Sequence, residues 1–252
     1  MSDLRQLLGE IAHCSIAKAI RLGDSPVSVP CHNVVSLQAG KSFQLPEPWS
    51  GQIDTAPLLF VSSNPAIDEL EVYPDESWED GKTIDFFQKR FTSEDGWVID
   101  GRALQQRGTR GRGVSFWGHA RNRAREILQR EVTPGVDFAL TEVVHCKSLK
   151  ERGVSEALDF CSERYLEKVI AIAAAKVLVV YGKHAADAVR GRFGSAMIPL
   201  EHGLSLISIK GIPRMLVFLP HPNRPGPKKT LEARVGDDGL KLIRAHMMSE
   251  RG

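Results

Sequence analysis

The chain has 252 residues, of which 42% are hydrophobic and 25% charged, and its formal net charge is +2. This near-neutral charge excludes a basic coat for nucleic acid, and no apolar run approaches the roughly 20 residues that a membrane helix needs. The first residues, MSDLRQLLGEIAHC, lack the apolar core of a signal peptide. We therefore expect a cytoplasmic protein without a membrane partner, long enough for one large domain or two small ones.

Hydrophobic periodicity predicts helices that alternate with short apolar strands. In chain order we expect a helix over 3–21, irregular chain over 22–50, a strand over 58–62, a long loop insertion over 67–112 with a short helix near 85–91, a helix over 121–130, a strand over 138–144, a helix over 155–174, a strand over 176–181, a helix over 183–193, strands over 205–209 and 215–219, and a helix over 231–248. This alternation predicts one α/β domain over 1–252. Its three layers are a mostly parallel central sheet and helices on both faces.

Ligands of such sheets bind beyond the carboxyl ends of the strands, so the loops after the predicted strands are the places to search for chemistry. Three of these loops carry polar residues, in the stretches SSNPA, HCKS and PHPNRPG. The strand over 176–181 ends in YGKHAA, which is an ordinary turn into a helix. Each signal is weak alone, because Asn-Pro is a common turn pair and His-Pro after a strand is usually structural.

Five stretches, in this order along the chain, resemble motifs of the uracil-DNA glycosylase superfamily. SSNPA is similar to the Gly-x-Asn-Pro-Gly water-activating motif, and GRGVSFWGHA to the Gly-x-Pro-Phe-x-Gly element that stacks on the extruded base. LTEVVHCKS and VLVVYGKHAADAV are similar to two strands of the iron–sulfur branch, and PHPNRPG to the His-Pro-Ser motif. The chain departs from these motifs at four positions, which are Ser62, Ala66, Glu142 and Asn223.

The resemblance implies a monomeric DNA repair glycosylase. Such an enzyme flips uracil or a related deaminated base out of the DNA and hydrolyses its N-glycosidic bond, leaving an abasic site. Asn64 would orient the attacking water, and His221 would donate a hydrogen bond to the leaving base. Phe116 would stack on the base, with Ser63 beside it. Two structural alternatives stay open, a simple turn at Asn64 and core packing of Phe116.

Glu142 stands where the family has an asparagine that reads the pyrimidine edge. An asparagine offers both a donor and an acceptor, whereas an ionised glutamate offers only acceptors. Its negative charge would also oppose a leaving anion, unless burial keeps the carboxyl protonated. We therefore expect either that Glu142 is turned away or that the chosen base differs from simple uracil.

Basic residues gather in two places. They could bind phosphates although the total charge is small, and two solvated loops explain them equally well. By resemblance, Asn223 and Arg224 would enter the minor groove. Phosphate contacts would come from Lys228, Lys229, Arg110 and Arg112.

The chain contains four cysteines, Cys14, Cys31, Cys146 and Cys161. Three of them fall near ligand positions of the iron–sulfur branch, so the resemblance implies a structural [4Fe–4S] cluster with Cys31 as the fourth ligand. Four thiolates suit zinc equally, and four buried free thiols without metal are the third alternative.

Two other functions compete with the glycosylase. The same fold could bind damaged or abasic DNA with little or no turnover, which the changes at Glu142 and Asn223 favour. A nucleotide- or phosphate-binding α/β protein could use Gly182 and the helix start that follows it. The lack of a complete Gly-x-Gly-x-x-Gly or P-loop motif weighs against this last interpretation.

Overall fold

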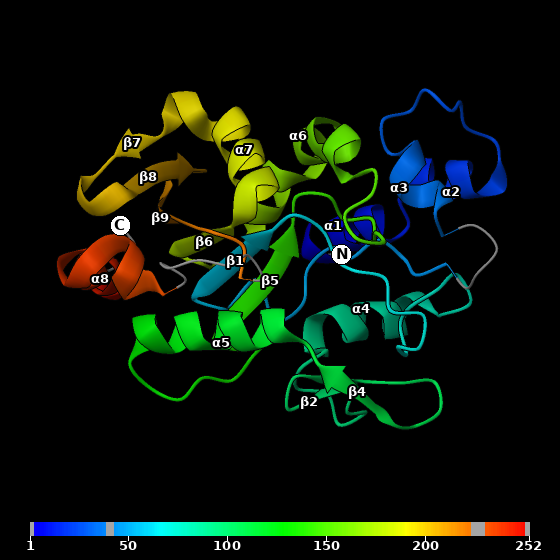
Figure 1. Cartoon of the computed structure of the whole chain (residues 1–252), viewed down its shortest axis with the longest axis horizontal. Coiled ribbons are helices and arrows are strands. Elements are labelled where there is room, and N and C mark those ends of the chain that lie inside the picture. Colours follow the sequence, from blue (N-terminus) through cyan, green and yellow to red (C-terminus); the bar gives the residue numbers. More distant parts are fainter. Residues whose placement is uncertain (1–2, 39–42, 223–229, 250–252) are drawn as a thin grey trace.

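The computed structural model describes residues 3–38, 43–222 and 230–249. Its centre is a six-stranded sheet in the order β5-β1-β6-β9-β8-β7 (Figure 1). The strands are β1 (Leu58–Ser62), β5 (Phe138–Glu142), β6 (Val177–Tyr181), β7 (Ile198–Pro199), β8 (Leu204–Ile209) and β9 (Ile212–Leu219). β5, β1, β6 and β9 are parallel, whereas β8 and β7 are added antiparallel. The prediction of a mostly parallel α/β sheet is confirmed.

Helices cover the sheet on both faces because its central strands bury side chains in both directions. In β1, Leu59 and Val61 join one hydrophobic cluster, and Leu58 and Phe60 join the other. The first cluster includes residues of α1 (Asp3–Ala12), α2 (Ser15–Leu22), α3 (His32–Ser36), α6 (Val154–Ile172) and α7 (Gly182–Phe193). The second includes residues of α5 (Ser115–Leu128) and α8 (Leu231–Met248). The alternation of β1 therefore explains the three layers.

Three local predictions need correction. The helix expected over 3–21 is two helices, because the backbone at Cys14 leaves the helical region (φ −50°, ψ 116°). The segment over 22–50 contains the short helix α3, and its last part, 43–50, is buried although it is irregular. The helix expected at 121 begins at Ser115. Phe116, which no predicted element contained, therefore lies in the first turn of this helix.

The stretch 67–112 was expected to be a long loop insertion with a short helix near 85–91, and this expectation also needs correction because the stretch forms regular structure. It contains α4 (Asp80–Lys89) and most of an antiparallel three-stranded sheet made by β2 (Val98–Ile99), β3 (Arg102–Leu104) and β4 (Arg110–Gly113). Phe86 and Phe87 of α4 are fully buried in the first hydrophobic cluster. β4 leads directly into α5 (Figure 1). The stretch therefore packs onto the main core and delivers the chain to the edge of the site described below.

None of the helices in the described ranges combines the length and the apolar character needed to cross a membrane.

Candidate active site

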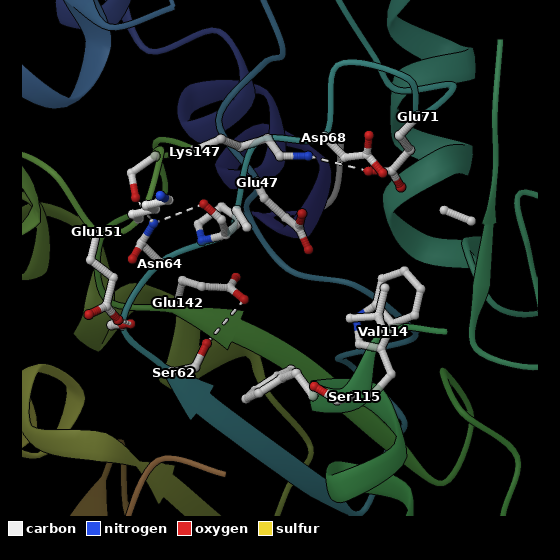
Figure 2. Close-up of a pocket in the computed structure, with 18 of the residues that line it drawn as sticks. Glu47, Ser62, Asn64, Asp68, Glu71, Val114, Ser115, Glu142, Lys147 and Glu151 are labelled. Atoms are coloured by element: carbon white, nitrogen blue, oxygen red, sulfur yellow. Dashed lines mark hydrogen bonds and ion pairs between the residues drawn. The ribbon is translucent and has the colours of Figure 1, made fainter. Parts of the chain in front are cut away.

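A cavity of about 400 Å³ lies at the carboxyl ends of β1 and β5. These strands are parallel neighbours in which Ser62 lies opposite Glu142, so the chain leaves both at the same place. The cavity brings together five residues that the sequence singled out, which are Ser63, Asn64, Phe116, Glu142 and His221. They come from four separate stretches of the chain, and Figure 2 shows several of the lining side chains around the open space.

The loops after β1 and β5 are held against each other. Backbone hydrogen bonds run from Val143 N to Ser62 O, from Val144 N to Ser63 O and from Ser148 N to Pro65 O. Pairing between the two segments thus continues beyond the strands, up to Pro65, which cannot donate a ladder bond. The polar side chains at the strand ends are consequently mounted on a stiff support.

Asn64 is half-buried and its amide orientation is determined by its partners. The Nδ2 group donates to the Pro65 carbonyl oxygen at 2.8 Å and to Ser148 Oγ at 2.6 Å (Figure 2). The Oδ1 atom is buried and has no hydrogen-bond partner among the described residues. The bond to Pro65 is the turn-like contact considered above, and it leaves the carbonyl side of the amide as an acceptor for a ligand or a water.

Phe116 and His221 form the aromatic part of the cavity. Their rings are nearly parallel, at 18°, with centroids 6.2 Å apart, and Phe116 also packs edge-on against Tyr181 at 5.5 Å. Gly182 borders His221 with a positive φ of 81°, and an added Cβ would lie 3.3 Å from the His221 Cβ. Gly182 therefore allows the loops after β6 and β9 to approach closely. This is a structural role that an ordinary strand-to-helix turn explains.

Glu142 is 5% exposed and its side chain extends toward the cavity (Figure 2). Ser62 Oγ donates to its Oε1 atom at 3.3 Å. Its Oε2 atom is buried and lacks a hydrogen-bond partner in the described part of the chain. Burial, followed by the negative charge of Glu47, raises the pKa of Glu142 well above its usual range.

A buried ionic network along the inner wall was not predicted from the sequence. Arg90 Nη1 lies 3.0 Å from both carboxylate oxygens of Glu47, and Arg90 Nη2 pairs with Glu71. Lys147 Nζ lies 3.4 Å from Glu71 Oε2. Tyr73 donates to Glu47 at 2.9 Å. Burial opposes ionisation of Glu47, but the charges of Arg90 and Lys147, together with hydrogen bonds from Ser50 and Tyr73, outweigh it and hold the pKa of Glu47 below the usual value.

The basic residues predicted to contact DNA are only partly described. Asn223, Arg224, Lys228 and Lys229 lie outside the described residues. Arg110 and Arg112 are exposed on β4, two to four residues before the cavity-lining Val114, and Arg110 donates to the Gly96 carbonyl oxygen.

The four cysteines are free thiols that lie close enough to influence one another. Burial raises the pKa of Cys31 to about 11, with a further contribution from Cys14. Burial also raises the pKa of Cys146 well above its usual value, and Cys161, Cys14 and Cys31 each add to that rise. No group of three or more His, Cys, Asp or Glu side chains in the described ranges is arranged to hold a metal ion. The thiols are thus neighbours in the fold without forming a ready-made metal site.

Comparison with protein families gives one match. Residues 88–228, more than half of the chain, match a model described as the uracil DNA glycosylase superfamily. The matched range contains Phe116, Glu142 and His221, whereas Asn64 lies before it. A search of curated proteins gives no significant match.

Proposed function

Because this chain belongs to the uracil DNA glycosylase superfamily, whose members act on DNA, we propose that it hydrolyses the N-glycosidic bond of uracil or a related deaminated base. The product is an abasic site. One observation carries the proposal: Asn64, Phe116, Glu142 and His221, which are separated in the chain, line a single cavity at the carboxyl ends of β1 and β5. Such a strand-end crevice is where α/β sheets bind their ligands.

The cavity receives a base that has been flipped out of the DNA stack. Phe116 stacks on the face of the base, a contact worth about 1–3 kcal/mol for a base on an aromatic ring. Ser63 and Glu142 face the polar edge of the base. His221 donates a hydrogen bond to the base and stabilises the negative charge that develops as the base leaves.

The nucleophile in this proposal is a water molecule that Asn64 orients. The unpartnered Oδ1 atom accepts a hydrogen bond from the water, while Ser148 and Pro65 hold the amide in place. An amide cannot remove a proton at neutral pH, so Asn64 positions the water rather than activating it as a base. This suffices where the sugar already carries oxocarbenium character, and attack by water makes the enzyme monofunctional.

Contacts outside the cavity would hold the DNA. Arg110 and Arg112 are exposed just before the cavity-lining residues and can bind phosphates. The assignments of Asn223 and Arg224 to the minor groove, and of Lys228 and Lys229 to phosphates, stay predictions. A cytoplasmic monomer whose single domain spans 1–252 also stays a prediction from the resemblance and the sequence.

We propose that Cys14, Cys31, Cys146 and Cys161 hold a [4Fe–4S] cluster. Four thiols that influence one another are the donor type that such a cluster needs, and a backbone hydrogen bond from His145 favours the Cys161 thiolate. The described side chains do not already form a metal-binding group, so the thiols would have to move together around the cluster. Cys14 and Cys31 stand at the starts of α2 and α3, so a cluster would join the N-terminal helices to β5 and α6. Zinc is the alternative occupant. Iron and acid-labile sulfide analysis of the purified protein, against zinc analysis, separates the two and also detects protein without metal.

A uracil-containing oligonucleotide tests the function directly. Incubation with the protein, followed by alkali, should cleave the strand at the uracil position, and Asn64→Ala should lose the activity while DNA binding survives. Asn122→Ala, on the exposed side of α5, is the matched control. Cleavage by wild type that equals a protein-free control would contradict the proposal.

A damaged- or abasic-DNA binding protein with little turnover is the second candidate. The engagement of Asn64 Nδ2 by Pro65 and Ser148 favours it, since those contacts also suit a purely structural turn. Counting product separates the two candidates: many equivalents of abasic site per protein support an enzyme, and one equivalent or less supports binding or trapping.

A further inference from the structure

The inner wall of the cavity contains more buried acids than buried bases. Three carboxyl groups, Glu47, Glu71 and Glu142, lie there with two cations, Arg90 and Lys147, and all five residues are at most 7% exposed. Five ionised groups would leave one net negative charge in a poorly solvated place. Burial of an unpaired charge is costly, and a carboxyl group avoids that cost by taking up a proton.

Both cations are engaged by the other two carboxylates. Arg90 contacts Glu47 and Glu71, and Lys147 contacts Glu71. In the described part of the chain no ion pair is found for Glu142, whose hydrogen bond comes from the Ser62 hydroxyl at 3.3 Å. The pairing therefore points to Glu142 as the carboxyl group that is neutral.

The charges around Glu142 agree with this assignment. Burial and the Glu47 carboxylate raise its pKa, whereas the Ser62 hydrogen bond and the charges of Arg90 and Lys147 lower it. The raising effects prevail, and the pKa is well above the usual range. The negative charges of Glu47 and Glu71, which pair with the two cations, offset part of the cations' attraction for an ionised Glu142.

A proton on Glu142 changes which base edge the cavity can read. With Ser62 donating to Oε1, the proton belongs on Oε2, the buried atom that has no partner among the described residues. A neutral carboxylic acid offers one donor and one acceptor, as an amide does. It also places no negative charge beside a base that leaves as an anion.

We propose that Glu142 reads the flipped base as a neutral acid, its Oε2 hydroxyl donating to a ring carbonyl and its Oε1 accepting from the adjacent ring N–H. This inference rests on the proposed glycosylase function and names its substrate class. The class comprises bases with a carbonyl beside a ring N–H, the edge that deamination creates, as in uracil, hypoxanthine and xanthine. An ionised Glu142 would instead repel that carbonyl oxygen.

Glu142→Gln is the central variant, because a glutamine keeps one donor and one acceptor but cannot lose a proton. Steady-state kcat/KM for uracil release should fall about tenfold per pH unit in the wild type once Glu142 ionises. Glu142→Gln should stay within about tenfold of wild type at neutral pH and lack that fall. His221 also lines the cavity and is present in both proteins, so the difference between their pH profiles reports on residue 142.

Two further variants complete the set. Glu142→Leu removes both hydrogen-bonding groups and should lose about 10²–10³-fold at every pH. Glu94→Gln, at an exposed position, should keep the wild-type pH profile. Thermal unfolding of each variant excludes misfolding as the cause of a loss.

Infrared difference spectra between wild type and Glu142→Gln test the protonation without any turnover. A protonated-carboxyl stretch in the wild type at neutral pH, absent from the variant, supports the proposal. Lack of that band, or a Glu142→Gln protein as inactive as Glu142→Leu while the wild type is active, overturns the role of Glu142 alone. A wild type that releases none of the three bases overturns the proposed function, and the base reading with it.

Discussion

Two groups of buried polar side chains border the same cavity, and they differ in how completely they are paired. Along the inner wall, Arg90 joins Glu47 and Glu71, and Lys147 also pairs with Glu71, so that every carboxylate of this wall network has a cation and Arg90 Nε is its one buried side-chain atom without a partner among the described residues. At the strand ends, Asn64 Oδ1 and Glu142 Oε2 are buried without partners among the described residues. Buried polar atoms normally find partners, so atoms that lack them need an explanation.

We infer from this difference that the inner wall stabilises the fold and that the strand-end residues carry out the chemistry. The paired wall stabilises irregular chain, because Glu47 lies in the buried segment 43–50 and receives hydrogen bonds from Ser50, Tyr73 and Arg90. The buried, unpartnered atoms at the strand ends are the ones that still have a hydrogen bond to form with a bound base or water. The comparison predicts that changes in the wall alter stability, and that changes at the strand ends alter activity.

Replacing Arg90 with alanine should give the largest effect. The substitution leaves the Glu47 carboxylate buried without its cation, and breaking a buried ion pair in this way costs about 3–5 kcal/mol of unfolding free energy. Urea unfolding measures the loss, with Arg112→Ala on the exposed strand β4 as the matched control. Adding Glu47→Gln to Arg90→Ala removes the orphaned charge and should recover part of the loss. If Arg90→Ala is as stable as the wild type, the inner wall does not have the structural role that we assign to it.

Asn64→Ala should lose about 10²–10³-fold in kcat, the range for removing one preorganised polar group at a transition state. Its free energy of unfolding should change little, because Asn64 is half-buried and makes its contacts at the end of a loop. Single-turnover kinetics measure the loss in the rate of the chemical step, and urea unfolding measures the change in stability. A stability loss as large as that of Arg90→Ala, with unchanged chemistry, would place Asn64 in the structural group instead.

Ser148→Ala should give a smaller effect that shows how the amide is held. The variant removes the 2.6 Å contact to Asn64 Nδ2 but keeps the bond to the Pro65 carbonyl. We expect kcat to fall about tenfold with KM unchanged, since misplacement of a positioning group slows the chemical step. A change in KM alone would show that Ser148 contributes to binding and not to the orientation of Asn64.

The sequence predicted the strand ends better than the wall for physical reasons. Strands that are buried on both faces give apolar runs, so β1 and β5 and the polar residues after them could be recognised. The break at Cys14 could not, because isoleucines at helical spacing continue across it. Arg90 pairs with Glu47 and Glu71, and Lys147 pairs with Glu71, between segments that are distant in the chain, and no local spacing encodes such pairing. The one sign of these wall residues in the sequence is that each is a charged residue close to apolar residues.

Glu142→Gln also changes stability, in a direction that depends on pH. Because burial raises the pKa of Glu142, the folded chain binds a proton that the unfolded chain releases above its ordinary carboxyl pKa. Wild-type stability therefore falls as pH rises between the unfolded and folded pKa values, by about 1.4 kcal/mol per pH unit from this group. The variant has no such fall, so its stability relative to wild type should increase steadily from acidic to neutral pH in urea unfolding. If the difference in unfolding free energy between Glu142→Gln and wild type is the same at every pH, Glu142 is ionised in the folded protein. The surroundings of Glu142 would then have to compensate its negative charge in another way.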